Sequence, residues 1–339
     1  MTAPMRMVDR FSSAVIRYPA LWNAFDKVAS KTLRIMYYHM VTDKQREHYF
    51  DGRAITAESF TDVVKLFKSK FEVISLSEAI ARAEEGRSLE KCVSLTFDDG
   101  FSECHSTIAP ILHDEGLTAT FFLIEDMVDN RDLMWRNKLI CVQRHTPGPV
   151  LQDALARLTD TNGAGAPVDM MAASFKWRHK DKDEFANRLW EESGLPPLSE
   201  WLDRHKPYMT TAQIRDLLAA GFDIGCHSKT HPLCGQLTYP ELEEEVVASS
   251  RRLGRKFARE VRYFSYPFGD RAPRDHEERL LQASNLQCLL GIYDTARNGS
   301  DYRRWERQGL EDPSGRAVAK YFLGPLKKRA VGLKLRYRP

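Results

Sequence analysis

The chain has 339 residues, of which 42% are hydrophobic and 29% are charged, and its formal net charge is +3 at pH 7. This length suffices for one large core with an inserted subdomain, and no apolar run approaches the roughly 20 residues of a membrane-spanning helix. The first 30 residues lack the apolar stretch of a secretory signal peptide, and the six cysteines show no pairing pattern. We therefore expect a cytoplasmic protein with free, buried thiols.

The positive charge is concentrated at the C-terminal end. After Asp312 no acidic residue occurs, and eight cations alternate with apolar and aromatic side chains up to Arg338. Such a tail, residues 316–338, is suited to peripheral contact with an anionic membrane or a lipid-linked phosphate. The alternative is a solvated tail that packs a few apolar residues on the core. No nucleic-acid-binding motif accompanies the charge, so we expect no nucleic-acid partner.

The apolar pattern predicts alternating strands and helices after an N-terminal helical segment. The predicted strands are 33–38, 71–76, 93–97, 118–124, 222–226, 261–266 and 287–292. The predicted helices between them are 56–69, 77–85, 106–115, 211–220, 239–259 and 275–283. This alternation is typical of a parallel sheet covered by helices, which either closes into a barrel or stays doubly wound. In both cases reactive side chains are expected at the C-terminal ends of the strands.

Residues 135–205 interrupt this alternation. They are charged and carry tryptophans, and a turn-rich stretch at 161–167 lies at their centre. We expect a helical insertion or lid there. The predicted organisation is an N-terminal helical segment (1–32), a barrel (33–134 and 206–295), the insert (135–205) and a C-terminal extension with the basic tail (296–339).

Two short motifs carry candidate chemistry. Asp98 and Asp99 follow the predicted strand 93–97, and His227 and His231 follow the strand 222–226. One carboxylate and two imidazoles are a common set of ligands for a divalent metal ion. Neighbouring residues of an extended chain point to opposite sides, so Asp99 would bind the ion and Asp98 would remain available as a base. A closed Cys2His2 zinc site that includes Cys226 and Cys234 is a rival interpretation.

These motifs resemble those of the polysaccharide deacetylases, carbohydrate esterase family 4. Thr96-Phe97-Asp98-Asp99-Gly100 matches the first motif of that family, and His227-Ser228-Lys229-Thr230-His231 matches the second. Ser265-Tyr266-Pro267-Phe268-Gly269 resembles the third. The resemblance implies an α/β fold, a partial seven-stranded (β/α) barrel of the polysaccharide deacetylase type, here with a helical insert. It also implies hydrolysis of an N-acetyl group on an amino sugar.

The resemblance further implies roles for individual residues. Asp98 is the catalytic base, and Asp99, His227 and His231 are the metal ligands. Zinc is the first choice of ion, with cobalt, manganese or nickel as alternatives. The backbone N–H of Phe268 is the oxyanion donor, beside Pro267 and Tyr266 at the substrate.

Two departures from the family pattern concern proton transfer. Ser265 stands where many members have an arginine that orients the base; Arg262 and Arg271 are the nearest substitutes, although neither is in register. The late histidine that usually acts as the acid is also absent. His39 ends the first predicted strand, in a Tyr-His segment that resembles the start of the biofilm-type deacetylases. We therefore expect His39 to be the catalytic acid; the alternative is a structural histidine.

The predicted function is therefore metal-dependent removal of an N-acetyl group from an amino sugar in a glycan or glycan precursor. The N-acetylated saccharide is the expected partner. Two alternatives remain open on the sequence alone. One is a metal hydrolase of a small non-sugar amide or imide, which the same scaffold would support. The other is a glycan-binding protein without catalytic activity.

Overall fold

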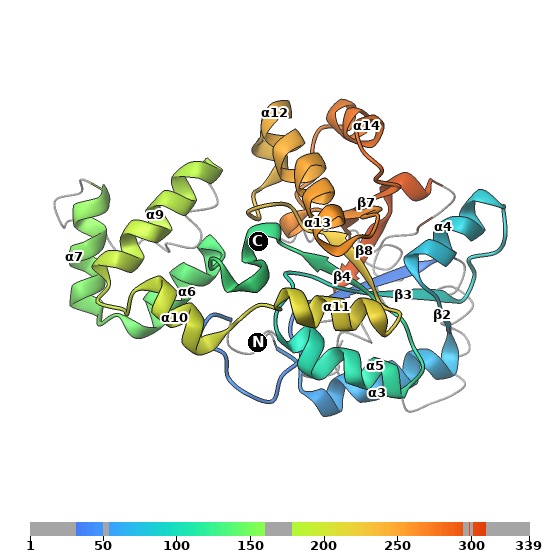
Figure 1. Ribbon diagram of the computed structural model, residues 1–339, viewed down its shortest axis with the longest axis horizontal. Helices are drawn as coiled ribbons and strands as arrows, with labels where there is room; N and C mark the ends of the chain where they lie inside the picture. The colour runs from blue at the N-terminus through green and yellow to red at the C-terminus, as the bar shows by residue number, and fades with distance from the viewer. Residues whose placement is uncertain (1–31, 50–53, 160–177, 294–297, 299–300, 310–339) are drawn as a thin grey trace, which may run out of the picture.

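The computed structural model describes residues 32–49, 54–159, 178–293, 298 and 301–309 (Figure 1). The predicted N-terminal helix and the basic tail lie outside these residues. None of the helices in the described part of the chain has both the length and the apolar character needed to cross a membrane. All six cysteines are free and buried, as predicted.

Parallel strands pair into a closed ring, and Figure 1 shows strands lying between the helices of the barrel. Of the eight strands in the sheet, seven belong to the ring and β2 pairs only with β3. The order around the ring is β1 (Arg34–Tyr38), β8 (Glu306–Gly309), β7 (Cys288–Ile292), β6 (Tyr263–Ser265), β5 (Asp223–Cys226), β4 (Thr120–Leu123) and β3 (Cys92–Phe97). The ring closes where β3 pairs along its length with β1, from Arg34 opposite Val93 to Tyr38 opposite Phe97. The predicted seven-stranded α/β barrel is confirmed.

Two strands differ from the prediction. The segment 71–76 forms only the short strand β2 (Glu72–Val73), which pairs with the start of β3, while β4 pairs with its end. Because β1 follows one edge of β3, β2 and β4 share the other edge and β2 stays outside the ring. The seventh place is taken by β8, which the sequence analysis assigned to the C-terminal extension.

Helices cover the outside of the ring between successive strands (Figure 1). They are α3 (Ala57–Lys70), α4 (Leu76–Glu84), α5 (Ala109–Asp114), α11 (Thr211–Ala219), α12 (Tyr239–Leu242), α13 (Ser249–Phe257) and α14 (Arg274–Gln282). Side-chain caps start several of them: the Thr56 hydroxyl accepts from the Ser59 N–H, and Thr210 and Gln213 form a capping box. Between α12 and α13 lies a π-helical turn, η4 (Glu243–Ala248).

The stretch 135–205 contains four described helices: α6 (Trp135–His145), α7 (Gly148–Thr159), α9 (His179–Glu192) and α10 (Leu198–His205). In Figure 1 they lie together at one side of the barrel. Trp135, Trp190 and Trp201 are buried in a hydrophobic cluster that also includes Phe101 and Tyr208 of the barrel loops. The helices of this segment, which we call the helical insert, therefore share a core with the C-terminal side of the barrel.

Candidate metal centre and active site

The site lies at the C-terminal ends of β3 and β5. Asp98 and Asp99 come directly after β3, and His227 comes directly after β5. The Asp98 N–H donates to the Tyr38 carbonyl (2.9 Å) and the His227 N–H donates to the Leu123 carbonyl (2.8 Å), so each motif begins where the ladder of the sheet ends. The register of the ring therefore places both motifs at the C-terminal ends of their strands.

Three ligand atoms meet at this edge. The Asp99 Oδ1 lies 3.4 Å from His227 Nε2 and 3.3 Å from His231 Nε2, and the two Nε2 atoms are 3.2 Å apart. A tetrahedral ion with bonds of about 2.1 Å requires ligand atoms about 3.4 Å apart. Asp99, His227 and His231 form a group able to hold a metal ion, and they are the only such group among the described residues. The buried Asp99 Oδ1 has no hydrogen-bond partner. The donor set therefore fits a divalent metal ion.

The histidines are in the state that metal binding requires. His227 Nδ1 lies 2.7 Å from the Ser265 carbonyl, which can only accept, so Nδ1 carries the proton and Nε2 presents a lone pair. Burial lowers the pKa of His231 to about 4, although the neighbouring Asp99 carboxylate acts in the opposite direction. Burial opposes ionisation of Asp99, yet the two imidazoles beside it hold its pKa well below the usual value.

Backbone conformations that favour glycine are concentrated here. Asp99, Ser228, His231 and Phe268 all have positive φ, between 58° and 69°. Each such residue costs energy that the surrounding structure must offset. Four residues of this kind around one group of ligands indicate that the loops are held in a specific, unfavourable shape.

Asp98 is bound on its other side by an arginine that the sequence analysis missed. Arg307 Nη1 donates to Asp98 Oδ1 (2.7 Å) and Nη2 donates to Oδ2 (2.8 Å), and both side chains are buried. Burial opposes ionisation of Asp98, but the Arg307 charge and, to a lesser extent, His227 hold its pKa below the usual value. Asp98 Oδ2 is 3.9 Å from His227 Nε2, so this carboxylate lies next to the three ligands without joining them.

Arg307 corrects the sequence analysis, which considered Arg262 and Arg271 as substitutes for the arginine of the third motif. Arg262 lies 3.8 Å from Asp223, and Arg271 forms ion pairs with Glu277 and Glu306. Neither contacts Asp98. Ser265 fits the same arrangement, because its hydroxyl accepts from Arg307 Nη2.

The sequence signal for Arg307 was weak. The strand that carries it is four residues long, with three polar side chains, so its burial could not be read from apolar periodicity. One feature of the sequence pointed to it. The third motif lacks its usual arginine, and Arg307 lies in the short segment that follows Trp305.

His39 lies beside Asp98 at the end of β1. It follows Tyr38, which is opposite Phe97 in the register and accepts the Asp98 N–H. It is half-buried, its ring packs edge-on against Tyr37, and its charge acts to lower the pKa of both Asp98 and Asp99. The structure therefore brings His39 to the same site as the two carboxylates, from a strand far away in the sequence.

The third-motif residues divide into two groups. The Phe268 ring packs edge-on against His231, with centroids 4.6 Å apart, which places its backbone beside the ligands. Pro267 is buried next to it. Tyr266 is fully buried, and its ring contacts Phe264 and Arg271. The described contacts of the Tyr266 side chain are thus with the core, whereas the sequence analysis expected it at the substrate.

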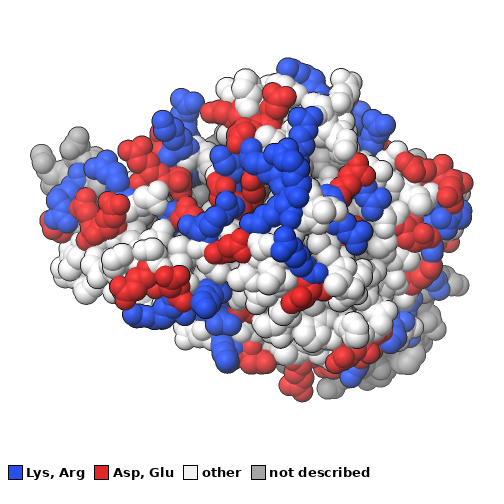
Figure 2. All heavy atoms as spheres, in the orientation of Figure 1, with Lys and Arg blue, Asp and Glu red and all other residues white. Residues whose placement is uncertain are grey.

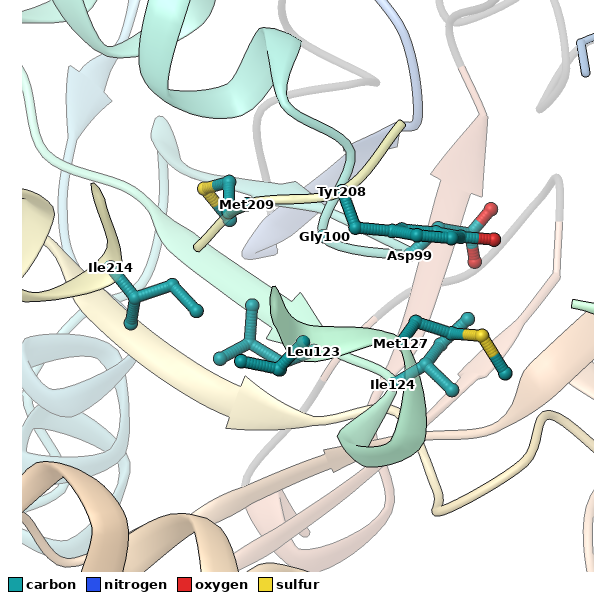
Figure 3. A pocket seen from close by; sticks show the side chains of 9 residues that line it. Asp99, Gly100, Leu123, Ile124, Met127, Tyr208, Met209 and Ile214 are labelled. Carbon is teal, nitrogen blue, oxygen red and sulfur yellow. The ribbon is translucent and has the colours of Figure 1, made fainter. Parts of the chain in front are cut away.

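Behind Asp99 lies a small pocket with mostly apolar walls (Figure 3). Figure 3 shows the Asp99 carboxylate beside the Tyr208 ring, with Met209 and Ile214 at the opposite end. The Tyr208 hydroxyl accepts from the Met134 N–H (3.3 Å), and burial holds its pKa well above the usual value. An apolar wall behind Asp99 excludes water on that side and strengthens its interaction with cations in front.

The rival Cys2His2 site is not formed. Cys226 Sγ lies 3.4 Å from the Ser249 hydroxyl, and burial raises the pKa of both Cys226 and Cys234. A thiol with a raised pKa is a poor metal ligand, because the thiolate is the form that binds. Both cysteines belong to the hydrophobic core.

Comparison with solved structures gives the same fold. The deacetylase PplD of Streptococcus pyogenes, in complex with acetate, is 13% identical, with a TM-score of 0.56 over 86% of this chain and 98% of that chain. IcaB of Ammonifex degensii is 16% identical, with a TM-score of 0.57 over 86% and 97% of the two chains. A de-N-acetylase of Aggregatibacter actinomycetemcomitans is 17% identical, with a TM-score of 0.54 over 85% and 99%. At such identities the likeness concerns the fold.

A search of curated proteins found no matching sequence. The sequence model of the polysaccharide deacetylase family matches residues 85–286, which is more than half of the chain and includes all three motifs. The chain is therefore a member of the polysaccharide deacetylase family, and an enzyme of that class.

Proposed function

We propose that this enzyme hydrolyses the N-acetyl group of an amino sugar in a glycan or glycan precursor, with zinc as its metal ion. One observation supports this most strongly: a carboxylate held by an arginine lies beside three ligand atoms spaced for one ion. The base and the metal site are thus separate but adjacent. Cobalt, manganese and nickel are the alternatives to zinc, because the same ligands accept them.

Asp99, His227 and His231 would hold the ion. When bound, such an ion supplies Lewis-acid polarisation of the acetyl carbonyl and lowers the pKa of a water molecule. The role of Asp98 is to accept a proton from the attacking water. Because Arg307 keeps Asp98 ionised, this base is in its active form at neutral pH.

His39 and Phe268 would act on the substrate. His39 is placed beside Asp98 and is half-buried, which suits a group that protonates the leaving amine as acetate departs. The Phe268 N–H would donate to the developing oxyanion, since its ring fixes the backbone beside His231. In this arrangement Asp98 would take a proton from the water, and His39 would give its own proton to the leaving amine.

The different roles of the two aspartates predict that the same substitution weakens metal binding at Asp99 but not at Asp98. Asp99→Asn should weaken metal affinity by more than roughly 100-fold, because even residues behind the ligands are worth about 10- to 100-fold. Asp98→Asn should bind the metal almost as well as the wild type. Competition against a chromophoric chelator measures both affinities, and equal weakening in the two variants would contradict the assignment.

Acetate release from acetylated chitooligosaccharides tests the proposed function. The wild type should release acetate, and chelation should abolish the release until metal is restored. Asp98→Asn and His39→Ala should each lower kcat by about 10²- to 10⁴-fold, the usual contribution of acid–base transfer, and both should retain metal. His113→Ala, at an exposed histidine on α5, is the matched control and should be as active as the wild type.

Three results would count against this account. Wild-type activity of His39→Ala would remove His39 from the mechanism. Hydrolysis of cyclic amides or imides without acetate release from saccharides would favour a non-sugar substrate. Bound metal with no acetate release from any glycan would favour a protein without catalytic activity.

We also propose that the enzyme acts in the cytoplasm, peripheral to the inner face of the membrane, on a lipid-linked or nucleotide-linked precursor. The basic, apolar tail at residues 316–338 supports this. The full-length chain should float with anionic liposomes at low salt and be released as salt screens the charges. Substitution of Lys327, Lys328 and Arg329 by Gln should weaken flotation, and no binding by the wild type at low salt would contradict the proposal.

A further inference from the structure

On the barrel side, one glutamate is hydrogen-bonded to the loop that carries both histidines. Glu245 Oε2 accepts the backbone N–H groups of Lys229 and Thr230, each at 2.9 Å, and Oε1 accepts the Thr230 hydroxyl at 2.6 Å. Glu245 is only 8% exposed and lies in the π-helical turn η4. Turns of this kind are frequent at functional sites. The carboxylate thus accepts three hydrogen bonds from the three-residue segment between His227 and His231.

The helical insert is hydrogen-bonded to the same loop from the opposite side. His179 of α9 lies with its Nε2 2.6 Å from the Thr230 hydroxyl oxygen. Since a carboxylate only accepts, the Thr230 hydrogen points to Glu245, and His179 Nε2 must therefore be the donor. Burial lowers the pKa of His179 to about 4, so the ring is neutral at pH 7 with its proton on Nε2. A chain of hydrogen bonds therefore runs from His179 Nε2 to the Thr230 hydroxyl, and from that hydroxyl to the Glu245 carboxylate.

A second contact from the insert reaches the ligand residue itself. Trp135 of α6 donates through Nε1 to the His231 carbonyl at 3.3 Å, and Trp135 is buried. Within the loop, the Ser228 hydroxyl accepts the His231 N–H at 2.8 Å. Both Ser228 and His231 have positive φ, so the loop needs outside contacts to stay in this shape.

We propose that the helical insert braces the metal-binding loop, and that His179, Thr230 and Glu245 are positioning residues for the ligands His227 and His231. This rests on the proposed function, because it takes those histidines as metal ligands. The insert then has a role at the metal centre that its place in the sequence does not suggest. Without the brace, the loop would leave its left-handed conformations and the ligand atoms would lose their spacing.

Metal affinity and loop protection together test the brace. Thr230→Val keeps the shape of the side chain and removes the hydroxyl that joins His179 to Glu245. Thr230→Val, Glu245→Gln and His179→Ala should each weaken zinc binding by roughly 10- to 100-fold, as expected for residues that orient metal ligands. The double variant of Thr230→Val and His179→Ala should be much less than additive, because both changes break one chain.

Hydrogen exchange of the metal-free protein provides a readout without the ion. The amides of residues 229–231 should exchange faster in each variant than in the wild type. Two controls match these changes. Glu244→Gln is the same substitution one residue earlier, at an exposed carboxylate that pairs with Lys229 Nζ and Arg252. His145→Ala removes an insert histidine that faces Glu47. Neither control should alter metal affinity or the exchange of the loop.

The outcomes separate this inference from the proposed function. Zinc affinity within about twofold of the wild type and unchanged exchange in Thr230→Val would overturn the brace; twofold is roughly the limit of additivity between independent sites. So would equal effects in Glu244→Gln. If Glu245→Gln fails to fold, Thr230→Val and His179→Ala decide. A wild type that binds no metal would contradict the proposed function, and the exchange measurement would still decide whether the insert holds the loop.

Discussion

The ion pair between Arg307 and Asp98 is the interaction on which the site depends. Both side chains are buried, and two parallel hydrogen bonds join them. The guanidinium lies over the rings of Tyr37 and Phe122, and it also donates to Thr96 and Ser265. Removal of one member would leave a buried charge uncompensated, at a cost of about 3–5 kcal/mol. The barrel and the proposed catalytic base are therefore stabilised by the same contact.

Contacts on both faces of β8 hold Arg307 in place. Successive side chains of β8 alternate, so Glu306 points outward where Arg307 points into the ring. Glu306 is bound by Arg271 at 2.8 Å, and its N–H donates to Asn298. Gly291 of β7 makes room for this pair, because a Cβ there would lie 2.3 Å from the Glu306 carboxylate. The contacts of Glu306 therefore fix the register of β8, and this register places Arg307 next to Asp98.

Much of the fold and of the candidate metal site could be predicted from the sequence, because these features are local. Apolar runs locate the long strands, and the Asp-Asp and His-x-x-x-His spacings locate the three side chains that the structure brings together. Arg307 could not be located in the same way, since its strand is short and polar and its burial depends on ring closure. The brace of Glu245 and His179 was equally hidden, because it joins elements that meet only after the insert has packed. The burial of Tyr266 against Phe264 and Arg271 could not be predicted either, because strand alternation does not say which way a side chain at the start of a turn points.

The pH dependence of kcat/KM tests the central claim that Arg307 keeps Asp98 ionised. As the proposed base, Asp98 must be deprotonated to act, so we expect activity to fall as the pH drops through its pKa. Arg307→Lys replaces the two-pronged contact by a point charge; we expect a lower kcat/KM and an acid limb at higher pH, with metal content unchanged. Arg303→Lys, at an exposed position four residues earlier, should follow the wild-type profile. An acid limb at the wild-type position in Arg307→Lys would contradict the account.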